Sequence, residues 1–237
     1  MIIASNFKTN HTRKATREFV EFINDFLKDT NDKHQVRVYP SFTALDVFDT
    51  VTAMKVGAQN FYPVDKGSFT GEVGYEQLEE FGVDSVLVGH SERRHILGER
   101  QEILLKKFHF AKEKNLEIIY CIGEPQEVRK AGIEAVMSYL WEQLEGIDLA
   151  YERLVVAYEP VWAIGTGLTA SLEDIQETHA RLRERVEAPI LYGGSVKVEN
   201  IYEVLSVKNC DGVLVGTASW EKESFCKMIE LAQTLKA

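Results

Sequence analysis

The sequence is poor in cysteine, in net positive charge and in long apolar runs. Its three cysteines, Cys121, Cys210 and Cys226, are far apart and form no C-x-x-C pair. An odd, scattered set excludes a disulfide framework and a structural zinc site, and it is typical of a reducing compartment. Lysine and arginine number 27 against 37 aspartates and glutamates, so the formal net charge is −10. This acidity argues against a nucleic-acid or anionic-membrane partner, since either needs a basic face.

Targeting and membrane-spanning patterns are also lacking. The first residues, Met1 to Lys8, do not combine a basic stretch with an apolar core, and no apolar run is long enough to cross a bilayer. We therefore expect a cytoplasmic protein. Of its 237 residues, 45% are hydrophobic and 27% are charged, as in an ordinary globular chain with a large core.

What the chain does contain is a regular alternation of short apolar runs and longer amphipathic segments. The apolar runs are residues 2–4, 36–39, 54–58, 86–89, 118–122, 154–158, 190–193 and 213–216. Most are too continuously apolar to leave one face in water, which favours parallel strands covered by helices. With no linker to divide the chain, the pattern predicts an α/β fold, a single (β/α)₈ TIM barrel domain over residues 1–237. A doubly wound sheet is the alternative, although it usually has fewer strands in a chain of this size.

A barrel carries its active site at the carboxyl ends of the strands, so the polar residues that follow each run are the candidates. Asn6 and Lys8 follow the first run. Residues two apart in a strand share a face, so both can point into the barrel mouth. Lys8 would supply the positive charge that an anionic substrate needs. An ordinary surface lysine is the alternative.

Glu159 directly follows the sixth run, and the loop after it contains Pro160, Trp162, Gly165 and Gly167. A carboxylate at the end of a buried strand, beside a loop that can close, is what proton abstraction in a dry pocket requires. The alternative is a proline turn and an ordinary surface loop. The glycines lie too far from the strand for a dinucleotide-binding fingerprint, so that motif is rejected.

His90 ends the fourth run, and Ser91 and Glu92 are typical of the first turn of a helix. A helix N-terminus aimed at the ring disfavours the imidazolium, so we expect a neutral His90 that donates a hydrogen bond. A structural core histidine is the alternative. The spacing of His90 and His95 matches no zinc motif.

Glycines follow the last two runs, at Gly193, Gly194 and Gly216. Ser195 is not predicted to be a nucleophile, because Lys197 replaces the second glycine of a G-x-S-x-G elbow. Glycines that lead into helix starts favour a cradle of backbone N–H groups for a phosphate. Barrels usually place such a cradle after strands seven and eight.

A long loop, residues 59–73, follows the third run and contains two phenylalanines and a tyrosine. A loop this long and this apolar does not simply lie in water. It predicts insertion into a partner subunit, or a lid.

Four segments carry a resemblance to a known family. They are Asn6-Phe7-Lys8, the segment Gly89-His90-Ser91-Glu92-Arg93-Arg94, the segment Tyr158-Glu159-Pro160-Val161-Trp162-Ala163-Ile164-Gly165-Thr166-Gly167, and Tyr192-Gly193-Gly194-Ser195-Val196. Together, and in this order, they closely resemble the signature segments of the triosephosphate isomerases, over the whole chain. The resemblance implies interconversion of dihydroxyacetone phosphate and D-glyceraldehyde 3-phosphate through an enediol(ate), in glycolysis and gluconeogenesis, with no cofactor and no metal.

The resemblance also implies roles for single residues. Glu159 would move the proton and His90 would act as a neutral electrophile, a pairing for which this family is the standard example. Asn6 and Lys8 would hold and polarise the substrate. The N–H groups that would face the phosphate are those of Gly165, Ser195, Gly216 and Thr217.

The resemblance extends to a lid and to a partner. Residues 160–168 would form the lid that excludes water. The family is normally a homodimer in which the loop 59–73 enters the neighbouring subunit, where Thr70 would support its site. Leu168 stands at a lid hinge that usually has lysine. Thr217 replaces a glycine, so a left-handed backbone there would be strained.

Two other functions remain open from the residues alone. A different phosphate-binding barrel enzyme, a lyase or a synthase, would share the glycine cradle. A non-catalytic barrel scaffold would tolerate the loss of Glu159, His90 or Lys8, and all three are present.

Overall fold

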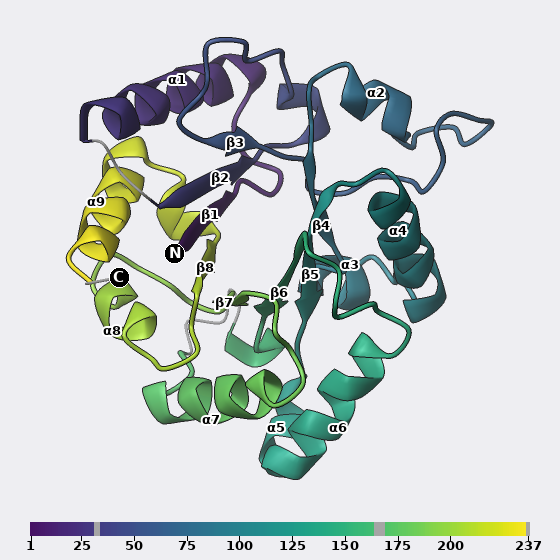
Figure 1. Cartoon of the computed structure of the whole chain (residues 1–237), viewed down its shortest axis with the longest axis vertical. Coiled ribbons are helices and arrows are strands. Elements are labelled where there is room, and N and C mark those ends of the chain that lie inside the picture. The colour runs from purple at the N-terminus through teal and green to yellow at the C-terminus, as the bar shows by residue number, and fades with distance from the viewer. Residues whose placement is uncertain (31–33, 164–168, 236–237) are drawn as a thin grey trace.

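The computed structural model describes residues 1–30, 34–163 and 169–235. A ring of strands lies at its centre and helices surround it (Figure 1). The strands are β1 (Ile2–Asn6), β2 (Gln35–Tyr39), β3 (Lys55–Val56), β4 (Ser85–Val88), β5 (Glu117–Ile122), β6 (Leu154–Tyr158), β7 (Ile190–Tyr192) and β8 (Gly212–Val215). The helices are α1 (Arg13–Thr30), α2 (Tyr75–Glu79), α3 (Ser91–His95), α4 (Gln101–Glu113), α5 (Gln126–Lys130), α6 (Ile133–Leu144), α7 (Leu172–Arg183), α8 (Ile201–Leu205) and α9 (Lys222–Gln233), with 3₁₀ turns η1 (Phe42–Ala44), η2 (Val161–Ala163) and η3 (Thr217–Ser219).

The strands form one parallel sheet in the order β3-β2-β1-β8-β7-β6-β5-β4. The remaining gap, between β3 and β4, is closed by Ala58, which pairs with Val86. The Ala58 N–H donates to the Ser85 carbonyl and the Leu87 N–H donates to the Ala58 carbonyl, both at 2.9 Å. The predicted (β/α)₈ barrel is therefore confirmed, and each predicted apolar run coincides with or overlaps one strand.

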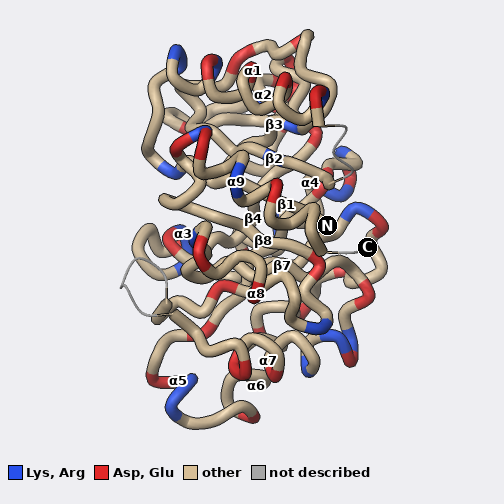
Figure 2. The backbone as a smooth tube through the Cα atoms, turned by 90° about the vertical axis from the view of Figure 1, so that its left-hand side faces the viewer, with Lys and Arg blue, Asp and Glu red and all other residues tan. Residues whose placement is uncertain are grey.

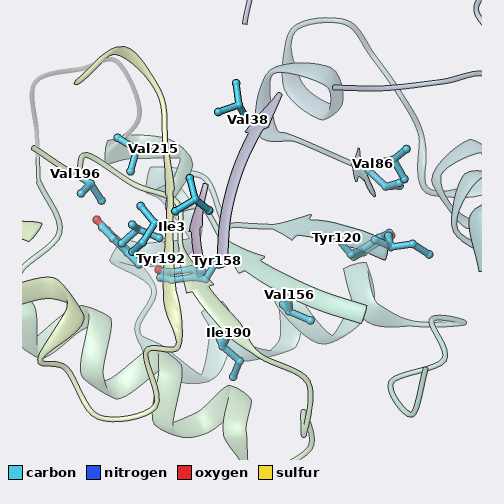
Figure 3. Packing of buried hydrophobic residues seen from close by; sticks show 14 of the residues in the cluster. Ile3, Val38, Val86, Tyr120, Val156, Tyr158, Ile190, Tyr192, Val196 and Val215 are labelled. Atoms are coloured by element: carbon cyan, nitrogen blue, oxygen red, sulfur yellow. The ribbon is translucent and has the colours of Figure 1, made fainter. Parts of the chain in front are cut away.

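Alternate residues of each strand pack into two separate cores. Ala4 and Ile119 belong to the set that fills the barrel, whereas Ile3 and Val156 pack between strands and helices, as Figure 3 shows. These side chains are almost completely buried, so the barrel is a packed core and not a pore. Most apolar runs appear continuous in the sequence because both faces of their strands are covered, whereas Lys55 of the short strand β3 is exposed.

The amino-terminal end of the barrel interior contains a buried ion pair beside apolar side chains such as Ile2. Arg37 on β2 is 2% exposed, and Glu117 on β5 is 8% exposed. The guanidinium donates from Nε and Nη2 to the two carboxylate oxygens, each at 2.5 Å. Ser85 adds a hydrogen bond to Glu117 at 2.9 Å and accepts one from Tyr39 at 2.7 Å. Every charged atom of the pair is thus engaged, as burial of a charge requires.

The pKa of Glu117 lies below its ordinary value. Burial acts to raise this pKa, but the hydrogen bonds and the charge of Arg37 outweigh burial. Glu117 therefore stays ionised inside the barrel because its partner is ideally placed.

Charged residues of both signs are interspersed along the outer helices and loops in the view of Figure 2. One lysine is an exception to surface placement. Lys107 on α4 is 2% exposed and donates to Asn60 at 2.6 Å and to Glu99. Burial lowers the pKa of Lys107, while Glu99 opposes this effect. Within the described ranges, no helix has the length and hydropathy of a membrane span.

We predict that Arg37→Met destabilises the protein by about 3–5 kcal/mol, because it leaves the Glu117 carboxylate buried without a counterion. Arg181→Met is the matched control, since it removes a half-exposed arginine that pairs with the exposed Glu134. The control should cost less than about 1 kcal/mol. Urea unfolding measures both. Equal costs for the two variants would contradict the importance assigned to the buried pair, and Arg37→Met/Glu117→Leu should recover much of the loss.

Candidate functional site

A cavity of about 470 Å³ opens where the strands end, and seven of the eight predicted site residues line it. These are Asn6, Lys8, His90, Glu159, Ser195, Gly216 and Thr217. They come from the ends of β1, β4, β6, β7 and β8, so distant parts of the sequence meet at one rim. Gly165, the eighth, and Leu168 lie outside the described residues.

Glu159 is 1% exposed, and its two carboxylate oxygens have different surroundings. The Ser91 N–H donates to Oε2 at 2.8 Å. Oε1 lies 3.1 Å from His90 Nε2, yet no donor among the described residues is aligned to form a hydrogen bond with it. A buried carboxylate oxygen that is not hydrogen-bonded is an effective proton acceptor, because little must be broken before it reacts.

Glycines make room for Glu159 on two sides. A Cβ atom at Gly123 would lie 1.7 Å from the Glu159 carbonyl oxygen, and one at Gly193 would lie 2.8 Å from Glu159 Cγ. The Glu159 backbone itself is fixed, since its N–H donates to the Ile122 carbonyl at 2.7 Å. Cys121 is buried close to this carboxylate. Burial is the main cause, and the charge of Glu159 the second, of a thiol pKa that lies well above its ordinary value. Cys121 is therefore a buried packing residue.

His90 lies at the N-terminus of α3, as the sequence predicts. Its Nδ1 atom accepts a hydrogen bond from the Glu92 N–H at 3.3 Å. Because Nδ1 accepts, the hydrogen of the neutral ring is on Nε2, the atom that faces Glu159. The ring is 7% exposed and can donate from Nε2 into the cavity.

Lys8 reaches the cavity by a different route from the one predicted. Strand β1 ends at Asn6, and Lys8 has a left-handed backbone with φ 52°. The turn is held by the Lys8 N–H, which donates to Asn6 Oδ1 at 3.0 Å, and by Gln59 Nε2, which donates to the Lys8 carbonyl at 2.8 Å. The ammonium group pairs with Glu92 at 2.7 Å. Sequence reasoning missed Gln59 and Glu92 as partners of Lys8, because both lie far from Lys8 in the chain.

The glycine loops differ in detail from the prediction. After β7, helix α8 begins only at Ile201, so the loop at 193–195 does not lead directly into a helix. After β8, Gly216 leads into η3, a 3₁₀ turn. Positive φ among the described non-glycine residues is confined to Lys8, His11, Asn115 and Asn209, so the strain considered for Thr217 does not arise.

Glu124 is a further buried carboxylate near the site, and its role was not predicted. It is fully buried and accepts hydrogen bonds on Oε1 from Trp162 at 2.9 Å and from Tyr158 at 3.1 Å. Burial raises its pKa, and the donors act in the opposite direction. Since Trp162 lies in η2, immediately after Glu159 and Pro160, these bonds fix the chain where it leaves β6.

The loop 59–73 extends beyond α2 in Figure 1. It is organised by its own contacts, since the rings of Tyr62 and Phe69 lie 4.3 Å apart and the Tyr62 N–H donates to the Val73 carbonyl at 2.8 Å. Phe61 is fully buried, whereas Phe69 is 42% exposed at the tip. The loop thus has a rigid base and presents an apolar ring to the outside.

No group of three or more His, Cys, Asp and Glu side chains within residues 1–30, 34–163 and 169–235 is arranged to hold a metal ion. A family model described as triosephosphate isomerase matches residues 1–232. The triosephosphate isomerase of Wolinella succinogenes is 53% identical over 97% of this chain and 99% of the relative. That of Nitratiruptor sp. is 53% identical over 100% of both chains, and that of Sulfurimonas denitrificans is 52% identical over 99% of this chain and 97% of the relative. The chain belongs to the triosephosphate isomerase family.

Proposed function

We propose that this isomerase interconverts dihydroxyacetone phosphate and D-glyceraldehyde 3-phosphate in the cytoplasm, with Glu159 as the base. The observation that carries the assignment of the base is the asymmetric Glu159 carboxylate. One oxygen is held by the Ser91 N–H, and the other is buried beside His90 and accepts no hydrogen bond from the described residues. The whole barrel, residues 1–237, would act as one catalytic domain.

The proposed reaction moves one proton between adjacent carbons without any net oxidation. Glu159 takes the proton from the carbon beside the carbonyl group, and the electron pair moves onto the carbonyl oxygen. His90 Nε2–H and the Lys8 ammonium group stabilise the negative charge that develops there. Glu159 then returns the proton to the other carbon, while one hydroxyl proton passes between the two oxygens through His90. Atoms and electrons balance without a cofactor.

The phosphate of the substrate would lie against the glycine loops. Ser195, Gly216 and Thr217 line the same cavity as Glu159, so their backbone N–H groups are the proposed donors. A Cβ atom at Gly216 would lie 3.2 Å from Lys8 Cε, so the absence of a side chain lets the lysine approach this loop. Neutral donors and one ammonium group suit a doubly charged anion in a protein whose net charge is −10. The family's lid, residues 160–168, would then exclude water.

We further propose a homodimer formed through the loop 59–73, with no nucleic-acid or membrane partner. A second hollow of about 740 Å³ adjoins the site and shares Asn6, Lys8 and His90 with it. Its wall includes Ile96 and Leu97, which are 76% and 62% exposed in the single chain. Apolar side chains this exposed, beside a hollow, suit the apolar tip of a partner's loop.

We predict that Glu159→Gln lowers kcat by at least roughly 10²-fold, because the amide has almost the same shape but cannot take the proton. A coupled assay with glyceraldehyde 3-phosphate measures the rate. Glu152→Gln makes the same change at an exposed position and should retain full activity. Turnover of Glu159→Gln at the rate of the unaltered protein would remove Glu159 from the mechanism.

Gly193→Ala tests whether the position of Glu159 matters as well as its charge. The new methyl group would lie closer to Glu159 Cγ than van der Waals contact allows and would push the carboxylate away. We expect kcat/KM to fall by on the order of 10²-fold, the typical cost of a misplaced catalytic group. Circular dichroism should still report a folded barrel. Activity within twofold of the unaltered protein would mean that the carboxylate has no single required position.

Thr70→Arg places a charged side chain at the exposed tip of the loop 59–73. We expect monomers with poor activity in analytical ultracentrifugation and in the coupled assay, because burial of an unpaired charge disfavours the interface. Thr52→Arg, at an exposed position outside this loop, is the control and should remain dimeric. A dimeric, fully active Thr70→Arg variant would contradict loop insertion.

A further inference from the structure

Two segments that line the cavity are joined by one side chain. Trp220 follows the turn η3, and its indole Nε1–H donates to the Asn6 carbonyl at 2.9 Å. The Trp220 backbone N–H donates to the Thr217 carbonyl at 3.2 Å. A single residue therefore contacts the segment that would hold the reacting carbons and the segment that would hold the phosphate.

His11 braces Trp220 by a contact with its backbone carbonyl group. Its Nε2 atom lies 3.0 Å from the Trp220 carbonyl oxygen, and since a carbonyl only accepts, Nε2 carries the hydrogen. The imidazole stacks on Phe7, with ring centres 4.3 Å apart and planes 24° from parallel. His11 has φ 66°, a left-handed backbone that a residue other than glycine keeps only when its surroundings hold it.

A second link between the same segments is buried beneath the first. Ser5 Oγ and Ser219 Oγ lie 2.7 Å apart, and both residues are fully buried. Ser219 Oγ lies 2.7 Å from the Gly216 carbonyl oxygen, to which it donates, so Ser5 is the donor to Ser219. The Ser219 N–H also donates to the Gly216 carbonyl, at 2.9 Å.

These bonds fix the direction of a phosphate-binding amide. The peptide between Gly216 and Thr217 is planar, so holding its carbonyl oxygen also sets the direction of the Thr217 N–H. The hydrogen bonds of Trp220 and Ser219 together set the placement of this amide relative to Asn6 and Lys8. A small substrate would reach from the Thr217 amide to Asn6 and Lys8. Because its phosphate and its reacting carbons are a fixed distance apart, the groups that bind them must also be held at a fixed distance.

We propose that Trp220, braced by His11, is a positioning residue that keeps Asn6 and Lys8 in register with the phosphate loop. The inference rests on the proposed function, since it assigns the two ends of the substrate to these segments. Trp220 lines the hollow beside the site and not the cavity that contains Glu159. It therefore acts through Asn6 and Thr217, without contact with the reacting atoms.

Trp220→Phe tests this role, because it keeps an aromatic ring and removes the indole N–H. We expect kcat with glyceraldehyde 3-phosphate to fall by about tenfold, near the upper end of what one hydrogen bond contributes. The inhibition constant of inorganic phosphate should stay within twofold, since the phosphate donors remain. Trp141→Phe is the matched control: Trp141 lies on α6 against Arg185 and lines neither the cavity nor the hollow beside it, so this change should leave both constants unchanged.

His11→Gly removes the brace without touching Trp220, and glycine readily adopts the left-handed backbone at this position. We expect a smaller loss of kcat in the same direction. Because both changes act through the Trp220 contacts, the double variant should have the kcat of Trp220→Phe alone. Rates are taken per folded molecule, with the folded fraction from circular dichroism, so that lost stability alone does not lower them.

Each other outcome has a definite meaning. A kcat of Trp220→Phe within twofold of that of Trp141→Phe would overturn the inference, as would effects of His11→Gly and Trp220→Phe that simply add. If Trp220→Phe does not fold, an unchanged kcat of His11→Gly overturns the inference. An unaltered protein with no isomerase activity would overturn the proposed function first, and this inference with it.

Discussion

The closed ladder of parallel hydrogen bonds is the constraint on which the rest of the structure depends. Closure brings the carboxyl end of every strand to one rim, and therefore brings Asn6, His90, Glu159 and Gly216 together although they are far apart in sequence. The strand pairing is shortest between β3 and β4, where an isolated bridge at Ala58 completes the ring within the described residues. Without that closure the helices would still cover a sheet, but the rim would not surround a single cavity.

Each end of the barrel contains a buried carboxylate, and the two carboxylates differ in how completely they are hydrogen-bonded. At the amino-terminal end, Glu117 is bonded to Arg37 and Ser85, so its charge is fully satisfied. At the carboxyl-terminal end, Glu159 is buried even more completely, yet only one of its oxygens is hydrogen-bonded within the described residues. A satisfied charge stabilises a closed barrel, whereas an incompletely satisfied one costs stability and remains able to react.

Much of the fold and the site could be predicted from the sequence, because strand runs and the polar residues after them are local patterns. Glu159 and His90 could be predicted in this way. The contacts of Lys8 could not be predicted, because its left-handed turn depends on Gln59 and its ion pair on Glu92, which are distant in the chain. Glu124 and Trp220 were missed for the same reason, since their partners lie in other segments of the chain. Spacing within one segment contains no information about such contacts.

The pairing of β1 with β8 also has a consequence for synthesis of the protein on the ribosome. Strands β1 and β8 are neighbours although they are far apart in sequence, so Asn6 and Lys8 leave the ribosome long before their partners Gly216 and Trp220. A nascent chain would contain Asn6 and Lys8 long before it contains the loop after β8. The seam between β1 and β8 therefore makes the synthesis of β8 and of the turn after it a condition for a complete site, and a nascent chain without them would expose an unpaired edge of β1.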